Sequence, residues 1–358
     1  MIDRQRARWL ASLAAGALAA APYPSAAIGG ESEQRAWIVQ IDDDFLALAQ
    51  RDEDYTAGFA YTLVDEDPAA HPLLLGGALD WVDDVTRFGR LRSDPASARR
   101  AVAFGLQLFT PRDLEAEQPL PDDRPYATLA YVTGAKLALD ADRAVALESS
   151  LTVGLLGLPA VGALHRNLHV LLSSPLPNGY AHQISNGGEP TFRYAISRER
   201  LLRSGAREER PYSVQFGLGA SIGYITEVSA EIAYRSGPLR VPWWSAPPLS
   251  ADYAGQRPFA ALFDTGAATS RGVVFEVGIE ARARLYNAFL QGQVRHSDVT
   301  FSSDELEHVL VEAWLGVATT LKTGLGVSYT IRTQTQEIAH GPGARGFTWG
   351  SISFMRRF

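Results

Sequence analysis

The last ten residues of the chain constrain its fold more than any other segment. In Trp349–Phe358, the large apolar side chains of Ile352, Phe354 and Phe358 stand two or four residues apart. Successive side chains of a β-strand point to opposite faces, so these three share one face. A strand with one apolar face and an aromatic end suits the wall of a transmembrane β-barrel, whose outer face contacts lipid.

The first 27 residues have the three parts of a secretory signal peptide. Three arginines precede the apolar run Trp9–Ala21, and the small residues Ser25, Ala26 and Ala27 follow. A basic start, an apolar middle and small residues before the cleavage point are typical of exported chains. We therefore predict a signal peptide at residues 1–27 and one outer-membrane domain at residues 28–358.

Between the two ends, apolar and polar residues alternate over segments long enough for a tilted strand to cross a bilayer. The segments are Trp37–Ile41, Ala57–Val64, Ala101–Phe109, Tyr126–Leu139, Ala144–Leu158, Thr191–Leu202, Tyr212–Ile225, Ser229–Arg235, Val273–Leu285, Val309–Leu321, Gly324–Thr333 and Gly346–Phe358. They predict an all-β protein, a transmembrane antiparallel up-and-down β-barrel of about twelve strands. The longer connections, residues 71–100 and Val241–Tyr253, are expected to be extracellular loops or short helical insertions.

Composition excludes several other classes. The only long apolar run, Trp9–Ala21, is too short to be a spanning helix, and lipid otherwise admits only closed barrels. A net charge of −7 argues against a nucleic-acid partner. The chain has no cysteine, which excludes thiol chemistry and disulfides. Barrel closure would hold such an exported chain together, and we expect a monomer in the bacterial outer membrane.

One segment departs from the strand pattern. Pro159–Ser173 spaces its leucines as a helix does, so we predict a short helical insertion that carries the active site near residues 160–173. His165 and His169 lie four residues apart and project from one helix face. That spacing suits a metal-binding pair, a catalytic histidine with a neighbour that orients it, or two ordinary polar residues on a surface helix.

Polar clusters stand near the strand ends. Asp42, Asp43 and Asp44 offer hard oxygen ligands for calcium, or form a solvated loop. Thr56, in the segment Asp54–Gly58, returns beside them if the first two strands form a hairpin.

Two further polar segments have simpler interpretations. Arg124 is flanked by carboxylates in Asp122–Tyr126, which favours a structural ion pair. Gln183 and Asn186 would support the helix by hydrogen bonds, or belong to a polar connecting loop.

Taken in order, these segments resemble a known family. The shared features are Asp42–Asp44, Asp54–Gly58, Phe109–Pro111, Asp123–Tyr126, Val153–Gly157 before a helix with a histidine near its end, and a Gln-x-x-Asn stretch. Their order resembles that of the outer-membrane lipid A 3'-O-deacylase family, from about Trp37 to Asn186, with the C-terminal strand in addition.

The resemblance implies a twelve-stranded barrel with its active site at the outer-leaflet end. It also implies calcium-dependent hydrolysis of the ester that links the 3' acyloxyacyl chain to lipid A, within lipopolysaccharide. The family's catalytic histidine falls on His169, its Asn-Asp pair on Asp42 and Asp43, and its threonine on Thr56. The family's helix glutamine is replaced by His165. One type of family member has a lysine in the stretch that corresponds to Thr110–Pro121, and Arg112 is the only basic residue there.

These residues predict one mechanism. His169 acts as general base on a water that attacks the ester carbonyl, since histidine titrates near neutral pH. Calcium held by Asp43 and a neighbouring aspartate stabilises the oxyanion, and Thr56 places the water or the metal. His165, Arg112, Gln183 and Asn186 are expected to contact the substrate or support the catalytic residues.

Two alternatives remain open at this stage. An outer-membrane phospholipase would share the barrel, calcium and ester chemistry, but would pair its histidine with a serine nucleophile. A non-enzymatic barrel, either a porin or a structural protein, would need no helix with two histidines, and a twelve-strand lumen is narrow for a broad pore.

Overall fold

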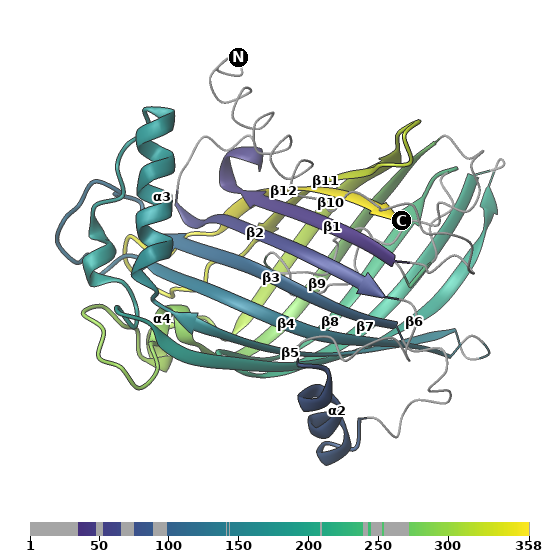
Figure 1. Ribbon diagram of the computed structural model, residues 1–358, viewed down its shortest axis with the longest axis horizontal. Coiled ribbons are helices and arrows are strands. Elements are labelled where there is room, and N and C mark those ends of the chain that lie inside the picture. The colour runs from purple at the N-terminus through teal and green to yellow at the C-terminus, as the bar shows by residue number, and fades with distance from the viewer. Residues whose placement is uncertain are drawn as a thin grey trace, which may run out of the picture.

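The computed structural model describes residues 35–47, 53–65, 75–88, 99–140, 142, 144–207, 210–238, 243–244, 253 and 272–357. These residues form one closed antiparallel barrel (Figure 1), in which each strand pairs with its neighbours in sequence and β12 pairs with β1. The described strands are β1 (Arg35–Asp43), β2 (Asp54–Asp65), β3 (Arg99–Thr110), β4 (Ala127–Asp140), β5 (Val145–Leu156), β6 (Glu189–Arg207), β7 (Arg210–Gly223), β8 (Ile225–Ser236), β9 (Val273–Asn287), β10 (Val309–Thr320), β11 (Gly326–Gln334) and β12 (Phe347–Arg357).

The predicted twelve-stranded barrel is confirmed, because every predicted segment overlaps one of these strands. The main difference is at Tyr224, where a tight connection separates β7 from β8, so that Ile225 begins β8 and does not end β7. Ile352 and Phe354 of β12 are half-exposed on one face. Phe358 and the predicted signal peptide at residues 1–27 lie outside the described residues.

Strand alternation separates a lipid-facing wall from a charged lumen, as β9 illustrates. Phe275, Val277 and Ile279 are exposed, whereas Glu276 between them and Glu280 and Arg282 beyond them are buried. Inside the barrel, Arg282 pairs with Glu312 of β10 at 2.9 Å, and similar pairs cross-link other strands. A barrel in lipid requires this arrangement, because its outer face contacts hydrocarbon and its buried charges need partners.

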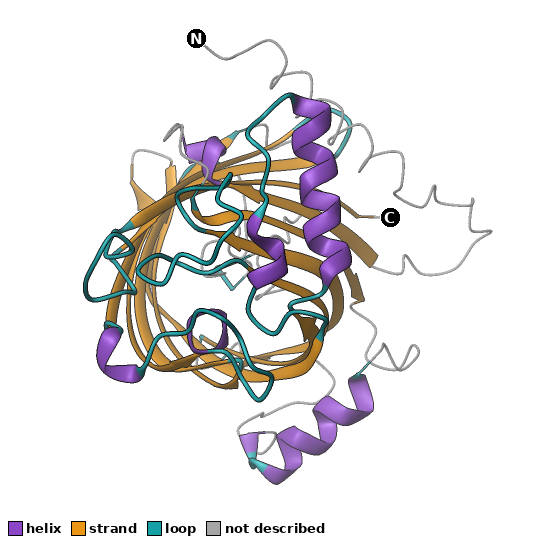
Figure 2. Cartoon of the chain, turned by 90° about the vertical axis from the view of Figure 1, so that its left-hand side faces the viewer, coloured by secondary structure: helices purple, strands orange, loops and turns teal. Residues whose placement is uncertain are grey.

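Five short helical elements lie in the connections at one end of the barrel. A 3₁₀ turn, η1 (Asp44–Ala47), follows β1, and α3 (Pro159–Leu172) and η4 (Gly179–His182) follow β5. Another turn, α4 (Ala288–Gln291), follows β9, and η5 (Ser303–Glu305) precedes β10. All five connect strands at the same end of the barrel, which we call the α3 end (Figure 2).

The two longest connections leave the barrel at the opposite end. One follows β2 and contains α2 (Gly76–Val85), so the predicted short helical insertion within residues 71–100 is present. The other follows β8 and includes Val241–Tyr253. An up-and-down barrel sends alternate connections to opposite ends, so both of these connections lie at the end away from α3. That they are extracellular stays a prediction.

An aromatic cluster fills the lumen near the α3 end. Tyr55, Phe109 and Trp349 are fully buried there, and the ring of Tyr253 lies 4.5 Å from that of Tyr55 and 5.1 Å from that of Phe109. Tyr253 comes from the connection after β8, so this residue lies inside the barrel far from the end at which its connection leaves.

None of the helices in the described ranges is long and apolar enough to cross a membrane.

Candidate active site

The predicted helix at residues 160–173 is confirmed as α3, which stands on the edge of the barrel (Figures 1 and 2). Pro159 occupies the first turn, where its missing N–H costs nothing, and Ser173 ends the helix in the left-handed conformation. The buried face contains His165 and His169 together with Gly162, whose backbone packs on the ring of Tyr180. Both predicted histidines therefore point toward the barrel.

A cavity of about 550 Å³ lies between α3, the first hairpin and the segment after β3. Its walls bring together six of the residues singled out from the sequence, namely Asp43, Asp44, Thr56, Arg112, His165 and His169. The remaining lining residues are Phe45, Glu53, Ala57, Asp113, Leu114, Glu115, Leu168, Leu172, Ser174 and Pro175. The tertiary structure thus places an imidazole pair in the same cavity as the carboxylates of Asp43 and Asp44, which lie more than 100 residues away in sequence.

His169 is held in a defined tautomer. Its Nδ1 lies 2.5 Å from the carbonyl oxygen of Pro175, and a carbonyl can only accept a hydrogen bond, so Nδ1 carries the proton and donates it. The other ring nitrogen, Nε2, then holds a lone pair. His169 is buried, with 7% of its surface exposed, and it lines the cavity. This geometry suits a general base.

His165 stacks edge-on against His169, with ring centroids 4.3 Å apart, and its Nδ1 lies 2.7 Å from the hydroxyl of Tyr180. Burial, and then the neighbouring His169, lower the pKa of His165 to about 3. The His165 imidazole is therefore neutral at physiological pH. It fixes the position of its neighbour through packing against the ring and adds no charge to the cavity.

A β-bulge in β2 places Thr56 on the wall of the cavity. The pairing of β2 with β3 shifts register between Tyr55 and Ala57, which leaves Thr56 as the extra residue. Its hydroxyl lies 2.5 Å from that of Thr110. Because Asp43 pairs with Ala57 across the hairpin, the bulge also sets Thr56 beside the acidic residues.

The acidic triplet is divided between two faces. Asp43 and Asp44 line the cavity, where Asp43 accepts a hydrogen bond from the amide of Phe45 and Asp44 accepts one from the amide of Glu53. The structure does not bring Asp42 to the cavity. Its carboxylate is buried on the lumen side of β1 and accepts hydrogen bonds from Gln40 and the Tyr55 hydroxyl.

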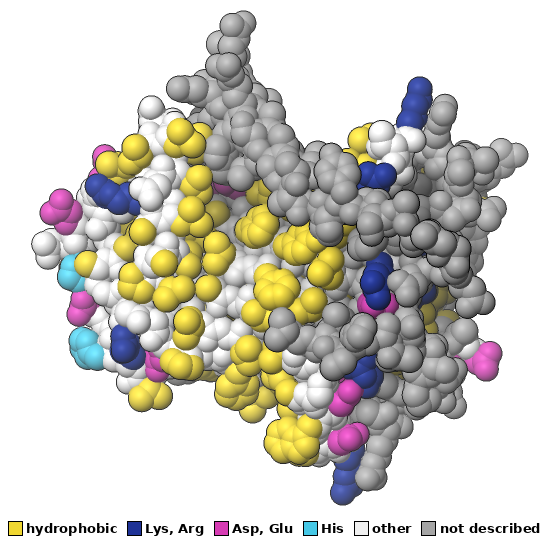
Figure 3. Space-filling model, in the orientation of Figure 1, with side chains coloured by type: hydrophobic (Ala, Val, Ile, Leu, Met, Phe, Trp, Pro, Cys, Tyr) yellow, Lys and Arg dark blue, Asp and Glu magenta, His cyan; other side chains and the backbone are white. Residues whose placement is uncertain are grey.

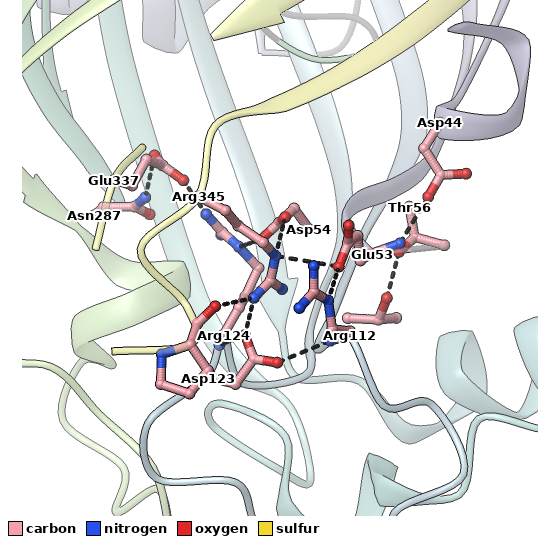
Figure 4. A network of polar contacts seen from close by, with 12 residues as sticks. Asp44, Glu53, Asp54, Thr56, Arg112, Asp123, Arg124, Asn287, Glu337 and Arg345 are labelled. Carbon is pink, nitrogen blue, oxygen red and sulfur yellow. Dashed lines mark hydrogen bonds and ion pairs between the residues drawn. The ribbon is translucent and has the colours of Figure 1, made fainter. Parts of the chain in front are cut away.

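A network of ion pairs begins at the cavity wall, at Glu53 and Arg112, and extends into the barrel (Figure 4). Arg112 donates from Nε to Glu53 at 3.0 Å, and Arg345 reaches Glu53 and Asp54 at 3.3 and 2.8 Å. Arg124 pairs with Asp54 at 3.0 Å, so the ion pair predicted for Arg124 is present.

The network holds Asp54 in the left-handed backbone region, with φ of 68°. Residues other than glycine adopt this region at some cost, which is smallest for asparagine and aspartate, and the guanidinium groups of Arg124 and Arg345 pair with Asp54 in this conformation. The network also includes Glu337, which pairs with Arg124. Burial raises the pKa of Glu337, but Arg124 and Arg284 outweigh it and hold that pKa below its usual value.

Gln183 and Asn186 lie behind α3 and do not line the cavity. Gln183 accepts a hydrogen bond from Thr128 at 2.8 Å and donates to Asn186 at 3.2 Å, and Asn186 donates to the carbonyl of Ala181. Thr128 also reaches the carbonyl of Leu158, the residue that precedes α3. Gln183 and Asn186 thus support the start of α3 through Thr128, and neither of the two lines the cavity.

Several residues of the site were missed by reasoning from sequence. Glu53 precedes the Asp54–Gly58 segment, and nothing in its sequence context distinguishes it from a surface acid. Arg345 is nearly 300 residues further along the chain. The carbonyl that orients His169 belongs to Pro175, and no side-chain pattern can indicate a backbone group. Tyr180 lies three residues before Gln183, but only the fold pairs it with His165.

The carboxylates of Asp43 and Asp44 have the oxygen chemistry that calcium prefers. Within the described ranges, no three acidic or histidine side chains gather closely enough to form a complete metal centre. A calcium ion at Asp43 and Asp44 would therefore take further ligands from water, backbone carbonyls or substrate oxygens, all of which calcium accepts.

The comparisons with known proteins concern the whole chain and its barrel fold. The model of the family "Outer membrane protein LpxR" matches residues 9–358. Among solved structures, LpxR from Salmonella typhimurium superposes with a TM-score of 0.66 at 12% identity, over 90% of this chain and 100% of that one. The β-domain of the Bordetella autotransporter BrkA is similar over 90% of this chain and 98% of its own, at 9% identity and a TM-score of 0.39.

At such identities the solved structures support the barrel fold alone, and no curated protein matches the sequence. The family match, by contrast, covers nearly the whole chain. This protein therefore belongs to the LpxR family of outer membrane proteins, the lipid A 3'-O-deacylase family that its motifs resemble.

Proposed function

We propose that this protein, acting as a monomer in the outer membrane, hydrolyses the ester that links the 3' acyloxyacyl chain to lipid A. One observation supports the proposal: His169, whose Nδ1 is hydrogen-bonded to the Pro175 carbonyl, lines the same cavity as Asp43, Asp44 and Thr56. A base facing hard oxygen ligands is the arrangement that metal-assisted ester hydrolysis requires.

The position of the cavity supports a lipid substrate. Ala57 lines it, and Phe59, the next residue on the same face of β2, lines an apolar trough of about 620 Å³ on the outer wall. The trough continues over β3, β4 and β5 through Phe104, Val132 and Val153, and Figure 3 shows apolar side chains gathered on this wall. A lipid in the bilayer can therefore lay an acyl chain on the barrel while its ester reaches the cavity.

Each residue has a distinct role in the proposed reaction. His169 removes a proton from water through Nε2 and later returns it to the leaving sugar oxygen. The Pro175 carbonyl and the ring of His165 hold His169 in place during both transfers. Thr56 orients the attacking water.

Charge at the rim completes the proposed site. Arg112 is more than half exposed and is anchored by Glu53, so its remaining N–H groups are placed to contact a phosphate of lipid A. A calcium ion at Asp43 and Asp44 would supply a Lewis acid for the oxyanion. It would also offset the negative charge that these acids present to lipid A phosphates.

Mass spectrometry of lipid A from cells that express the protein tests the proposal. Wild type should release the 3' acyloxyacyl mass in calcium and not in chelator, whereas His169→Ala should release none while its barrel still shows heat-modifiable migration in gels. Lipid A that stays intact with the wild-type protein in calcium would refute the proposed activity.

The same experiment separates the phospholipase alternative. Ser174 also lines the cavity, so it is a candidate nucleophile for such an enzyme. Under our proposal, Ser174→Ala retains deacylation and no lysophospholipid appears. Release of lysophospholipid that depends on Ser174 would favour the phospholipase.

A further inference from the structure

The helix α2 is docked on the outside of the barrel, far from the cavity (Figures 1 and 2). Leu79 is buried against Leu151 and Tyr194 of β5 and β6. Asp83 is equally buried and accepts hydrogen bonds from Ser149 at 2.9 Å and from Tyr194 at 2.8 Å. These contacts fix both the position and the rotation of α2 on the outer wall.

The helix α2 lies on the outer wall where the lipid-facing apolar residues of the strands give way to charged ones. On β3, the outward positions that lead away from the α3 end are Leu106, Phe104 and Val102, and the next one is Arg100. On β4, the corresponding series ends at Lys136. Asp80 of α2 pairs with both cations, at 2.9 Å to Arg100 and 2.5 Å to Lys136. Lipid-facing walls change from apolar to charged at the headgroup level, so α2 lies at that level.

The face of α2 that points away from the barrel carries an apolar stripe, and the exposed Asp84 lies at the border of that stripe. Ala78, Trp81 and Val85 stand at i, i+3 and i+7, and all three are exposed, Trp81 to 67% and Val85 to 63%. Such a stripe on a soluble protein would normally be buried. Here it continues the lipid-facing wall, and the acids of α2 that face the barrel already have cationic or hydroxyl partners.

We propose that α2 is an interfacial helix that inserts Trp81 and Val85 among the lipid headgroups at the end of the barrel opposite α3. Tryptophan concentrates at membrane interfaces, because its ring is apolar and its N–H is polar. An amphipathic helix lying in the interface plane buries one apolar stripe in this way. The helix thereby anchors the side of the barrel that also carries the cavity and the apolar trough. This inference does not depend on the hydrolase activity.

Depth-dependent fluorescence quenching tests the proposal, and the cysteine-free sequence makes it direct. Trp81→Cys and Val85→Cys are labelled with an environment-sensitive fluorophore and reconstituted in phosphatidylethanolamine–phosphatidylglycerol vesicles. Ile232→Cys, on the lipid-facing wall of β8, is the control for the hydrocarbon region. Val294→Cys, which is 96% exposed in the connection after β9, is the control for water.

The labels at 81 and 85 should have blue-shifted emission relative to 294. Spin labels at the lipid headgroup should quench them more strongly than spin labels at mid-chain, and the label at 232 should show the reverse preference. Emission and quenching at 81 and 85 equal to those at 294 would overturn the proposal and leave a water-exposed face for a protein partner. Heat-modifiable migration of each variant confirms that the barrel is folded.

Discussion

Asp42 and Asp43 are neighbours in the sequence but lie on opposite faces of β1. The side-chain period of a strand is two, so a shift of one residue moves a carboxylate from the lumen to the outer cavity. Asp42 accepts hydrogen bonds from Gln40 and Tyr55 inside the barrel, whereas Asp43 lines the cavity that also contains His169. The chemistry of each residue therefore follows from its face and not from its charge.

This division predicts a difference between two matched variants. Asp43→Asn should raise the calcium concentration needed for half-maximal deacylation, because it removes a charged ligand from the cavity. Asp42→Asn changes the same group one residue away and should leave that calcium concentration unchanged. Titrations of lipid A deacylation with calcium compare the two. A larger effect from Asp42→Asn would contradict the assignment of faces.

The buried His165 predicts a pH dependence of stability. Its pKa is near 6.5 in the unfolded chain and about 3 in the folded protein. Between these values the unfolded chain binds a proton that the folded protein excludes, so lowering the pH favours unfolding. The contribution of neutral His165 is complete above about pH 6.5 and is lost as the pH falls toward 3.

Thermal unfolding in detergent micelles at pH 7.5 and pH 5 measures this effect. Acidification should lower the unfolding temperature of wild type more than that of His165→Gln, which keeps polarity but cannot titrate. Equal losses in the two proteins would show that His165 is not the group responsible.

At the scale of elements, the packing of α3 determines the position of His169. Its position depends on close packing at Gly162, where an added Cβ would lie 2.6 Å from the ring of Tyr180. Tyr180 also contacts Nδ1 of His165, so the same residue sets both the distance of the helix and the orientation of its histidines. The bulge at Thr56 has the corresponding role in the hairpin.

Gly162→Ala should therefore impair catalysis without unfolding the barrel. The helix must move away from Tyr180 to accept the methyl group, and a displacement of about 1 Å at a catalytic group can cost about 100-fold in rate. Deacylation rates of reconstituted protein provide the measurement. Leu164→Ala, on the exposed side of the same helix, is the control and should keep full activity. Full activity of Gly162→Ala would show that α3 tolerates this shift.

For the whole molecule, the barrel is a scaffold with a filled interior. Buried arginine–glutamate pairs cross-link its strands, such as Arg235 with Glu276 at 2.9 Å and Arg284 with Glu227 at 2.7 Å. Near the α3 end, the aromatic cluster around Tyr55, Phe109 and Trp349 occupies the lumen. The proposed chemistry takes place on the outer surface, where lipid is available, and needs no passage through the barrel.

Planar bilayer recordings check this description. The buried ion pairs and the aromatic rings that the described residues place in the lumen predict no steady channel conductance at neutral pH. A small porin reconstituted in the same lipid is the positive control. Stable, voltage-independent conductance from the wild-type protein would instead favour the non-enzymatic pore.

The sequence by itself determined the barrel, its strands and the helix with the two histidines, because alternation and helical spacing are local patterns that lipid and the backbone impose on every segment. Only the tertiary structure decided which neighbours serve the site. It turned Asp42 into the lumen and Asp43 into the cavity, and it set the Pro175 carbonyl against His169. It also joined Glu53 to Arg345 and placed Tyr253 inside the barrel. These contacts join segments that closure of the barrel brings together across long stretches of chain, and no local pattern encodes them.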